Sequence, residues 1–322
     1  MSETNTMLRE AISAVVITGI LKKKELEIKK SDKGEAIVGH IIVDTGNGNE
    51  VRIDTYVNRM TKGSADKPSQ ESSVWKNQLR VIEDYVSVAE CMKNGDDLET
   101  ARAKATRFTV KARLDLNDYP DRSGAMVSMP RINANFSYFT RIGDGQAFEP
   151  SARFEVEGFL EQKRPEMKGD DETGRLILEL IVPGYQGAAR PMTFVTSKEA
   201  APYIEDHYDV GTTIHVYGEV IERLDVATIR KAGFMREEVS ETTTRVSELL
   251  IDNGDPEPYE EDSQKSYTRE SIQAAMRVRE LEYLPAVKQR ATERSANKGN
   301  AAGGGFAGFA GKAPQSNTGF KF

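Results

Sequence analysis

The feature that most constrains this chain is an order of extended segments that occurs twice. Segments rich in β-branched and aliphatic residues alternate with glycine, asparagine and proline turns in both halves of the sequence. The predicted strands are residues 14–30, 36–43, 51–57, 107–114 and 125–142, and then 152–163, 176–183, 191–196, 212–223 and 243–251. A chain with this pattern is expected to fold mainly as β structure.

A helical period separates the third and fourth strands of each half. Val74, Leu79, Ile82, Val86 and Ala89 recur every three to four residues, which predicts a helix over residues 72–92. A second helix is expected over residues 97–105, and a shorter one over residues 198–205 of the second half. Five strands with a helix between the third and fourth is the order of an OB barrel.

The two halves are related by a constant spacing. Residues 19–21 (Gly-Ile-Leu) recur as residues 158–160 (Gly-Phe-Leu), and residues 42–43 (Ile-Val) recur as residues 181–182, both 139 positions later. At the same spacing Thr55 corresponds to Phe194. We therefore expect two tandem OB-type five-stranded barrels with inserted helices, followed by a C-terminal helix and a disordered tail.

The expected organisation follows from these elements. Helical spacing at Ile272, Ala275, Met276 and Leu281 predicts the last helix, and the end of the chain is rich in glycine and alanine with scattered phenylalanines. The expected parts are a first barrel over residues 1–145 with a helical insertion at 72–105, a second barrel over 151–253, an acidic linker over 254–267, a helix over 268–294 and a disordered tail over 295–322.

Composition argues against several classes of protein. The single cysteine, Cys91, excludes an internal disulfide, and His40, His207 and His215 have no partner at metal-ligand spacing, so we expect no metal and no cofactor. No stretch approaches the roughly 20 apolar residues of a spanning helix, and the N-terminus is polar. The chain is expected to be soluble and cytoplasmic, with no membrane partner.

The net charge of −7 is unevenly distributed. Residues 237–262 contain ten acidic residues and one basic residue, so the remainder of the chain has a small positive balance. That remainder can offer a basic surface to phosphates.

No catalytic constellation stands out in the sequence. The run at residues 303–305 (Gly-Gly-Gly) lacks the lysine of a phosphate-binding loop, and the carboxylates at 257–262 lack the ligand alternation of a calcium loop. We therefore expect a binding protein and not an enzyme.

Strand parity selects a basic face that carries aromatic rings. Alternation separates outward from inward side chains along each strand of the first barrel, and lysines cluster near its first hairpin turn. The predicted nucleic-acid-binding residues are Lys22, Lys24, Lys29, Arg52, Tyr56, Arg107, Lys111, Arg113, Arg131, Phe139 and Arg141. Cations that follow phosphates and rings that stack on bases are what single-stranded nucleic acid requires. The alternative is that Tyr56 and Phe139 cover the barrel ends and the lysines only confer solubility.

The second barrel differs in the charge of its exposed positions. Glu155, Glu157, Glu179 and Glu219 fall on parities expected to face water. We expect this barrel to contribute less to binding.

Two segments resemble a known family. Residues 210–219 (Val-Gly-Thr-Thr-Ile-His-Val-Tyr-Gly-Glu) are similar to the glycine-flanked fourth strand of OB-fold single-stranded DNA-binding proteins, and residues 244–251 to the closing strand. Over residues 14–253 the chain resembles the larger members encoded by tailed bacteriophages. The resemblance implies binding of single-stranded DNA without sequence preference in replication, recombination or repair, in the cytoplasm of a host cell.

The resemblance also implies a tail that recruits replication or recombination proteins, here through Phe320 and Phe322. The chain departs from the bacterial pattern, because Lys312 and Lys321 lie near its end and its acidic run precedes the last helix.

Two other functions remain open from the sequence. OB barrels also serve as hubs in virion parts, so a structural or assembly protein is one alternative. An adaptor or inhibitor that imitates DNA with acidic residues 237–262 is the other.

Overall fold

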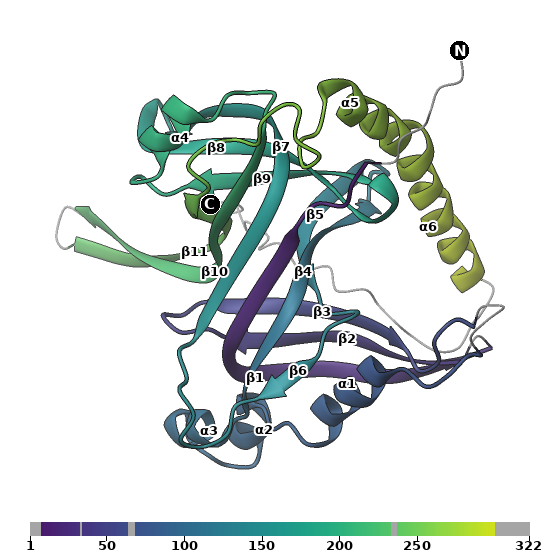
Figure 1. The fold of residues 1–322 in the computed structure, drawn as a ribbon. Helices are drawn as coiled ribbons and strands as arrows, with labels where there is room; N and C mark the ends of the chain where they lie inside the picture. Colours follow the sequence, from purple (N-terminus) through teal and green to yellow (C-terminus); the bar gives the residue numbers. More distant parts are fainter. Residues whose placement is uncertain (1–7, 33, 64–67, 233–236, 300–322) are drawn as a thin grey trace, which may run out of the picture.

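The chain forms two β barrels that lie next to each other and share strand pairs (Figure 1). The computed structural model describes residues 8–32, 34–63, 68–232 and 237–299. The first barrel contains β1 (Ser13–Ser31), β2 (Gly34–Asp44), β3 (Glu50–Asn58), β4 (Arg107–Pro120), β5 (Met126–Asn133) and the short β6 (Phe139–Arg141). The second contains β7 (Ser151–Lys168), β8 (Asp171–Pro183), β9 (Ala189–Thr196), β10 (Thr213–Ala232) and β11 (Glu237–Gly254).

Both barrels have the strand order of an OB fold. In the first, neighbouring strands run β1-β2-β3-β5-β4, and β4 pairs back with β1 to close the barrel. In the second, the order β7-β8-β9-β11-β10 is closed by pairing of β10 with β7. One pair of strands in each barrel is parallel: β3 with β5 in the first and β9 with β11 in the second. The predicted mainly β fold with two tandem OB-type barrels is confirmed.

An antiparallel pair of first strands joins the barrels. β1 pairs with β7 from Ser13 opposite Val156 to Thr18 opposite Ser151. Val15 lies opposite Phe154, which is its own counterpart at the spacing of 139 residues. Each barrel therefore presents the same strand to the other, and the junction is approximately two-fold symmetric.

The spacing of 139 residues holds for the first strands but not for the next two. Leu21 pairs with Val43, while its counterpart Leu160 pairs with Leu180, so the second strands are offset by 137 residues. The third strands are offset by 141, which makes Thr196 the counterpart of Thr55. The predicted matches of residues 42–43 with 181–182 and of Thr55 with Phe194 are wrong, because the hairpins of the two barrels differ in length.

A close approach of the second strand favours glycine at the same point in both first strands, more strongly at Gly19 than at Gly158. A Cβ on Gly19 would lie 2.5 Å from the Asp44 carbonyl oxygen, and one on Gly158 would lie 3.1 Å from the Leu180 Cβ. These close approaches explain why glycine recurs in the repeated motif.

Helices fill the connection between the third and fourth strands. The first barrel has α1 (Ser73–Glu83), α2 (Val88–Lys93) and α3 (Leu98–Lys104), whereas the second has α4 (Ala201–His207). The predicted helix over residues 72–92 is divided, because Ser87 begins α2 with a capping box: its hydroxyl accepts from the Glu90 amide, and the Glu90 carboxylate accepts from the Ser87 amide.

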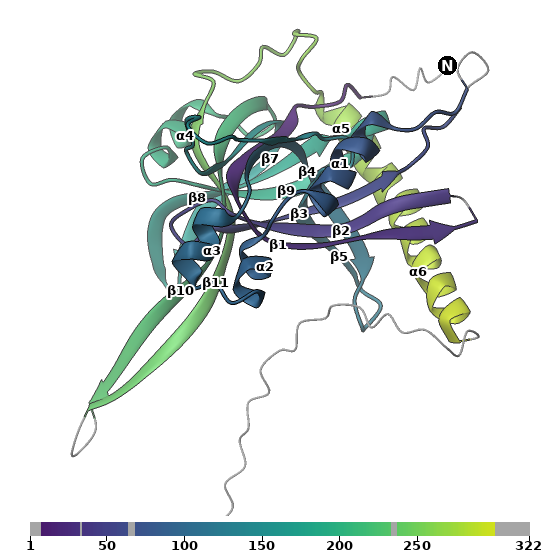
Figure 2. The same ribbon diagram turned by 90° about the horizontal axis from the view of Figure 1, so that it is seen from below.

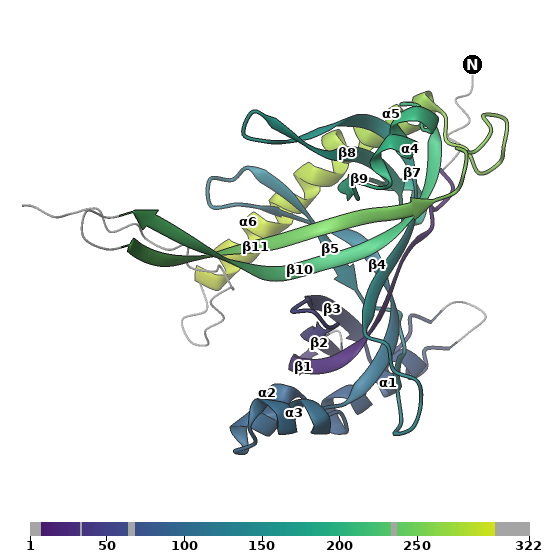
Figure 3. The same cartoon turned by 90° about the vertical axis from the view of Figure 1, so that its left-hand side faces the viewer.

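The β4–β5 hairpin of the first barrel and the β10–β11 hairpin of the second differ in length. The β10–β11 hairpin is longer than predicted and projects from the body (Figures 2 and 3). Its base is braced by Asn49 of the first barrel, whose Nδ2 donates to the Val220 carbonyl (2.8 Å) and whose Oδ1 accepts from the Glu222 amide (2.6 Å).

The β4–β5 hairpin of the first barrel is covered by the C-terminal helices. These are α5 (Arg269–Val278), a π-helical turn (Arg279–Tyr283) and α6 (Leu284–Gly299). The buried guanidinium of Arg279 pairs with the buried carboxylate of Asp118 and donates to the Ser128 hydroxyl (3.0 Å) and the Ala189 carbonyl (3.4 Å). The predicted C-terminal helix is thus present, and it contacts both barrels.

The segment between the second barrel and α5 packs on β7 and β10. The Tyr259 amide donates to the Thr213 carbonyl (2.9 Å), and the Tyr259 hydroxyl donates to Glu157 (2.7 Å). Glu157 is 1% exposed, so its predicted place on a wet face is wrong.

Two further predictions can be set against the described part of the chain. Its helices all lack the combination of length and apolar character that a membrane span requires. The predicted disordered tail lies almost entirely in residues 300–322, outside the described residues, and Phe320 and Phe322 lie there with it.

Candidate nucleic-acid interface

The outward surface of β1, β2 and β3 forms a three-stranded face on the first barrel. Directly opposed residues of antiparallel strands project to the same side, so the strand register defines rows across this face. The rows are Lys23, Ile42 and Arg52; Glu25, His40 and Asp54; and Glu27, Val38 and Tyr56. We call this surface the β1–β2–β3 face.

Alternation along β3 is as predicted. Val51, Ile53 and Val57 are buried, while Arg52 is exposed and Tyr56 is 55% exposed. Arg52 and Tyr56 are four positions apart on the same side of the strand, roughly 13 Å along it, and Asp54 lies between them.

The cations of this face are held by carboxylates of the same face. Arg52 Nε lies 2.9 Å from Asp54, and Lys29 Nζ lies 3.0 Å from Glu27. Lys22 pairs with Glu50, and Lys23 pairs with Glu25. Exposed pairs of this kind contribute little to stability, so a phosphate can exchange with the carboxylate at small cost.

The neighbouring charges shift the pKa values of two groups in the middle row, Glu25 and His40. The hydrogen bond from Lys23 holds the pKa of Glu25 below its usual value. Burial and the nearby Arg52 charge lower the pKa of His40, which disfavours the charged form of its ring. The His40 ring lies between the carboxylates of Glu25 and Asp54 in this row.

Lys24 does not belong to this surface. Its side chain is only 14% exposed, and its ammonium donates to the carbonyls of Ile82 (2.8 Å) and Tyr85 (2.6 Å) at the end of α1. A lysine at this position satisfies carbonyls that have no partner within the helix. Its predicted position on the binding surface is wrong.

Phe139 is also absent from the surface. It is 5% exposed and packs against Phe108, with ring centroids 5.6 Å apart. The predicted strand over residues 125–142 ends at Asn133, and Phe139 belongs to the separate β6, where its orientation is independent of Arg131. The prediction of an exposed Phe139 fails because the strand is interrupted.

The interruption exposes two rings that strand parity did not select. Phe136 is 79% exposed and Tyr138 is 50% exposed, both on the loop between β5 and β6. The asparagines at positions 133 and 135 are the sequence signal for this break.

The remaining predicted residues lie on other sides of the barrel. β4 is two strands away from β3 in the closed order, so Lys111 and Arg113 project in a different direction from Arg52. Arg113 pairs with Glu10, Arg131 lies 3.4 Å from Asp115, and Arg107 stacks over the Phe148 ring. Arg141 is exposed near the end of the barrel. The predicted residues thus do not form one continuous face.

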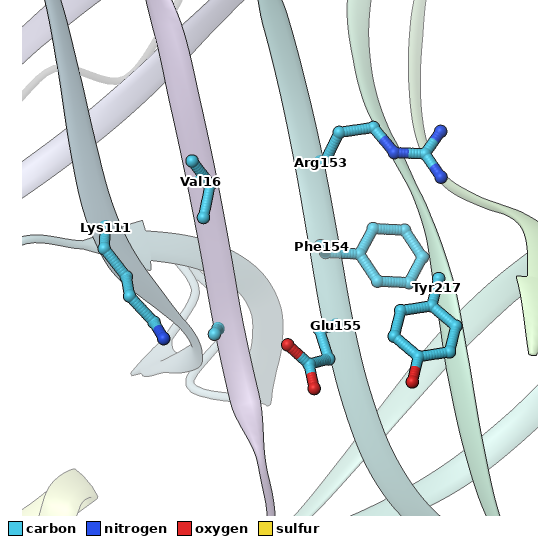
Figure 4. A pocket seen from close by; sticks show the side chains of 7 residues that line it. Val16, Lys111, Arg153, Phe154, Glu155 and Tyr217 are labelled. Carbon is cyan, nitrogen blue, oxygen red and sulfur yellow. The ribbon is translucent and has the colours of Figure 1, made fainter.

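Lys111 faces the junction of the two barrels. It lines a shallow pocket of about 190 Å³ together with Val16, Arg153, Glu155 and Tyr217 (Figure 4). Lys111 makes no ion pair within the described part of the chain, whereas Arg153 pairs with Asp252 and Glu219. This pocket is separate from the β1–β2–β3 face.

The second barrel presents a different surface at the corresponding place. The register of β7, β8 and β9 makes Gln162, Glu179 and Thr193 the counterparts of Lys23, Ile42 and Arg52. Ile177 and Val195 take the places of His40 and Asp54. These five counterparts include neither a cation nor an aromatic ring.

A family profile matches most of the chain. The profile of the YorF family covers residues 12–293, which include both barrels and most of the C-terminal helices. The chain belongs to the YorF family. No curated protein matches this YorF chain in sequence.

Among solved structures, the YorF chain is similar to the single-stranded DNA-binding protein from Thermus aquaticus. The wild-type structure gives a TM-score of 0.42 with 10% sequence identity, over 80% of this chain and 97% of that one. A deletion mutant of the same protein gives a TM-score of 0.42 with 10% identity, over 80% and 99% of the two chains.

Proposed function

We propose that this chain binds single-stranded DNA without sequence preference, on the β1–β2–β3 face of the first barrel, and serves replication or recombination. The observation that carries the proposal is that the exposed Tyr56 ring and the exposed Arg52 side chain lie on the same face of an OB-type barrel. A ring of this kind stacks on any base, and the cations near it neutralise phosphates. Binding of this kind needs no catalytic group.

The arrangement of charge further supports reversible binding. Arg52, Lys22, Lys23 and Lys29 are paired with exposed or partly exposed carboxylates, which a polyanion can displace. Every phosphate that a cation neutralises releases counterions from the DNA, so affinity falls as salt rises. A protein that covers DNA only transiently benefits from such moderated affinity.

The test is fluorescence-anisotropy binding of labelled oligo-dT and of a matched duplex at two salt concentrations. Tyr56→Ala should weaken oligo-dT binding by roughly 1–3 kcal/mol. Arg52→Ala should reduce the salt slope by roughly 0.7. Thr193→Ala, at the counterpart of Arg52 in the second barrel, is the matched control and should bind like the parent.

A second pair of substitutions tests which side of the barrel binds. Lys111→Glu with Arg113→Glu changes the β4 side and leaves the β1–β2–β3 face intact. Loss of binding only in this double variant would move the site to the barrel junction. No binding of oligo-dT by the parent at low salt would overturn the proposed function and favour a virion assembly role.

A further inference from the structure

The 134–138 loop carries the most exposed aromatic ring among the described residues. Phe136 is 79% exposed, and Tyr138, two residues later, is 50% exposed. Rings of this size usually bury most of their surface, so two exposed rings on one short loop mark a candidate binding surface.

The loop is held rigidly by two amides of α1. Gln78 is fully buried, and its Nε2 donates to the Ala134 carbonyl (2.7 Å) while its Oε1 accepts from the Thr55 hydroxyl (2.6 Å). Asn77 makes a reciprocal pair with the backbone of Phe139, accepting from its amide (2.7 Å) and donating to its carbonyl (3.0 Å). Rings on such a loop lose little conformational entropy when a ligand binds.

The loop also lies directly against the β1–β2–β3 face. Asn135 Oδ1 accepts from the Tyr56 amide (2.8 Å), and the Ala134 amide donates to the Asp54 carbonyl (2.8 Å). On its other side the Tyr138 hydroxyl bonds the Ser73 hydroxyl (2.6 Å) at the start of α1. The loop therefore continues the exposed surface from Tyr56 toward α1.

Cations accompany this continuation. Lys76, one helical turn after Ser73, is 62% exposed, and Arg59, just beyond β3, is 47% exposed. Both pair with Glu71, and these pairs are accessible to solvent. Flat rings bordered by exchangeable cations suit unpaired bases joined by phosphates better than they suit an apolar protein surface.

We infer that Phe136 and Tyr138 form a second base-stacking subsite, which extends the path of single-stranded DNA from Tyr56 toward α1. The inference rests on the proposed function, since it assigns further nucleotides to the same ligand. In the described part of the second barrel no loop corresponds to this one, because β11 leads directly to the segment that packs on β10.

The experiment compares binding of oligo-dT with binding of an abasic oligomer of equal length. It is done at low salt, where phosphate contacts alone are expected to sustain binding of the abasic oligomer. Phe136→Ala and Tyr138→Ala should each weaken oligo-dT binding roughly five- to 150-fold. Neither should change binding of the abasic oligomer. Tyr138→Phe keeps the ring and should bind like the parent, as should Tyr185→Ala, which removes a 70% exposed ring from the second barrel.

Each other result overturns the inference in a recognisable way. Parental affinity for oligo-dT in both alanine variants would leave the proposed function standing and assign the rings to a protein partner. Equal loss on both oligomers would show a purely structural role for the rings. Failure of the parent itself to bind would overturn both proposals. Should the alanine variant at position 136 unfold, Phe136→Leu, which keeps the bulk and loses the aromatic face, replaces it.

Discussion

The two barrels share their supporting residues and differ in their surfaces. Lys24 donates to carbonyls at the end of α1, and its counterpart Lys163 donates in the same way to Glu205 (2.6 Å) and Tyr208 (2.7 Å) at the end of α4. Gly19 and Gly158 recur for the same close approach of the second strand. Identity at equivalent positions therefore marks residues that the barrel needs in order to fold.

Positions that differ between the barrels identify the residues available for function. Arg52 corresponds to Thr193, and Asp54 corresponds to Val195. β3 and β9 keep the same alternation of buried positions despite these two differences, so the barrel fold does not require a charged residue at either position. The charged residues of the first barrel are thus the better candidates for ligand binding.

The hairpins of the last two barrel strands show a second contrast. The β4–β5 hairpin lies under the C-terminal helices, while the β10–β11 hairpin extends away from the body (Figure 3). Arg279 and Asp118 join the covered hairpin to the helices, with side chains 7% and 2% exposed. This pair fixes the covered hairpin in place.

The largest effect is expected from breaking that pair. Arg279→Met leaves the buried Asp118 carboxylate without its partner, which should lower the free energy of unfolding by about 3–5 kcal/mol. Urea denaturation, monitored by the fluorescence of Trp75, measures this loss in the first barrel. Trp75 is the single tryptophan and is buried.

The double variant Arg279→Met with Asp118→Leu should recover part of the stability, because no buried charge of this pair then remains. Arg290→Met, on the exposed side of α6, is the control. If Arg279→Met unfolded at the same urea concentration as the parent, the C-terminal helices would not support the covered hairpin.

The next effect concerns the two capping lysines. Lys24→Met and Lys163→Met should each cost about 1.5–3 kcal/mol, the range for hydrogen bonds made by a charged group, and should leave oligo-dT affinity unchanged. Thermal unfolding and anisotropy on the same samples measure both quantities.

Lys22→Met is the control for this pair, since its ammonium pairs with Glu50 on the surface and should contribute less than about 1 kcal/mol. If Lys24→Met had parental stability but weaker DNA binding, Lys24 would act in DNA binding and would not have the same structural role as Lys163.

The sequence was sufficient to predict the two barrels, because strand periodicity and turn residues are local signals. The spacing of the glycine motif also survived, since Gly19 and Gly158 serve the same close approach. The matches in the second and third strands failed because a constant spacing assumes that equivalent hairpins have equal lengths, and in this chain they do not.

The candidate site was predicted only in part. Parity along one uninterrupted strand placed Arg52 and Tyr56 outward correctly. It failed for Phe139, because the break after Asn133 depends on Gln78 and Asn77, which hold the loop from a helix more than fifty residues earlier. Ion pairs such as Arg113 with Glu10 are invisible to strand parity because their partners lie in other segments.

At one pair of equivalent positions, the first barrel has a neutral side chain and the second has an acidic one. Thr18 of β1 bonds Thr109 (3.0 Å), whereas its counterpart Glu157 in β7 is a buried carboxylate. Burial alone would raise the pKa of Glu157, but hydrogen bonds from Arg9, the Ile12 amide and the Tyr259 hydroxyl outweigh it and lower the pKa. The second barrel therefore contains an acid-sensitive interaction where the first has a neutral one.

The smallest effect is expected from Glu157→Gln. A carboxyl with a lowered pKa in the folded state adds stability above its unfolded pKa of about 4.3, and this stability is lost as pH falls through the folded value. The variant should be about 1 kcal/mol less stable than the parent at pH 7, and the difference should shrink toward pH 3. Urea denaturation at pH 7, 5 and 3 measures the difference, with the exposed Glu260→Gln as control. A difference that stays constant over this range would mean that the carboxylate charge does not hold the N-terminal segment and residue 259 on the second barrel.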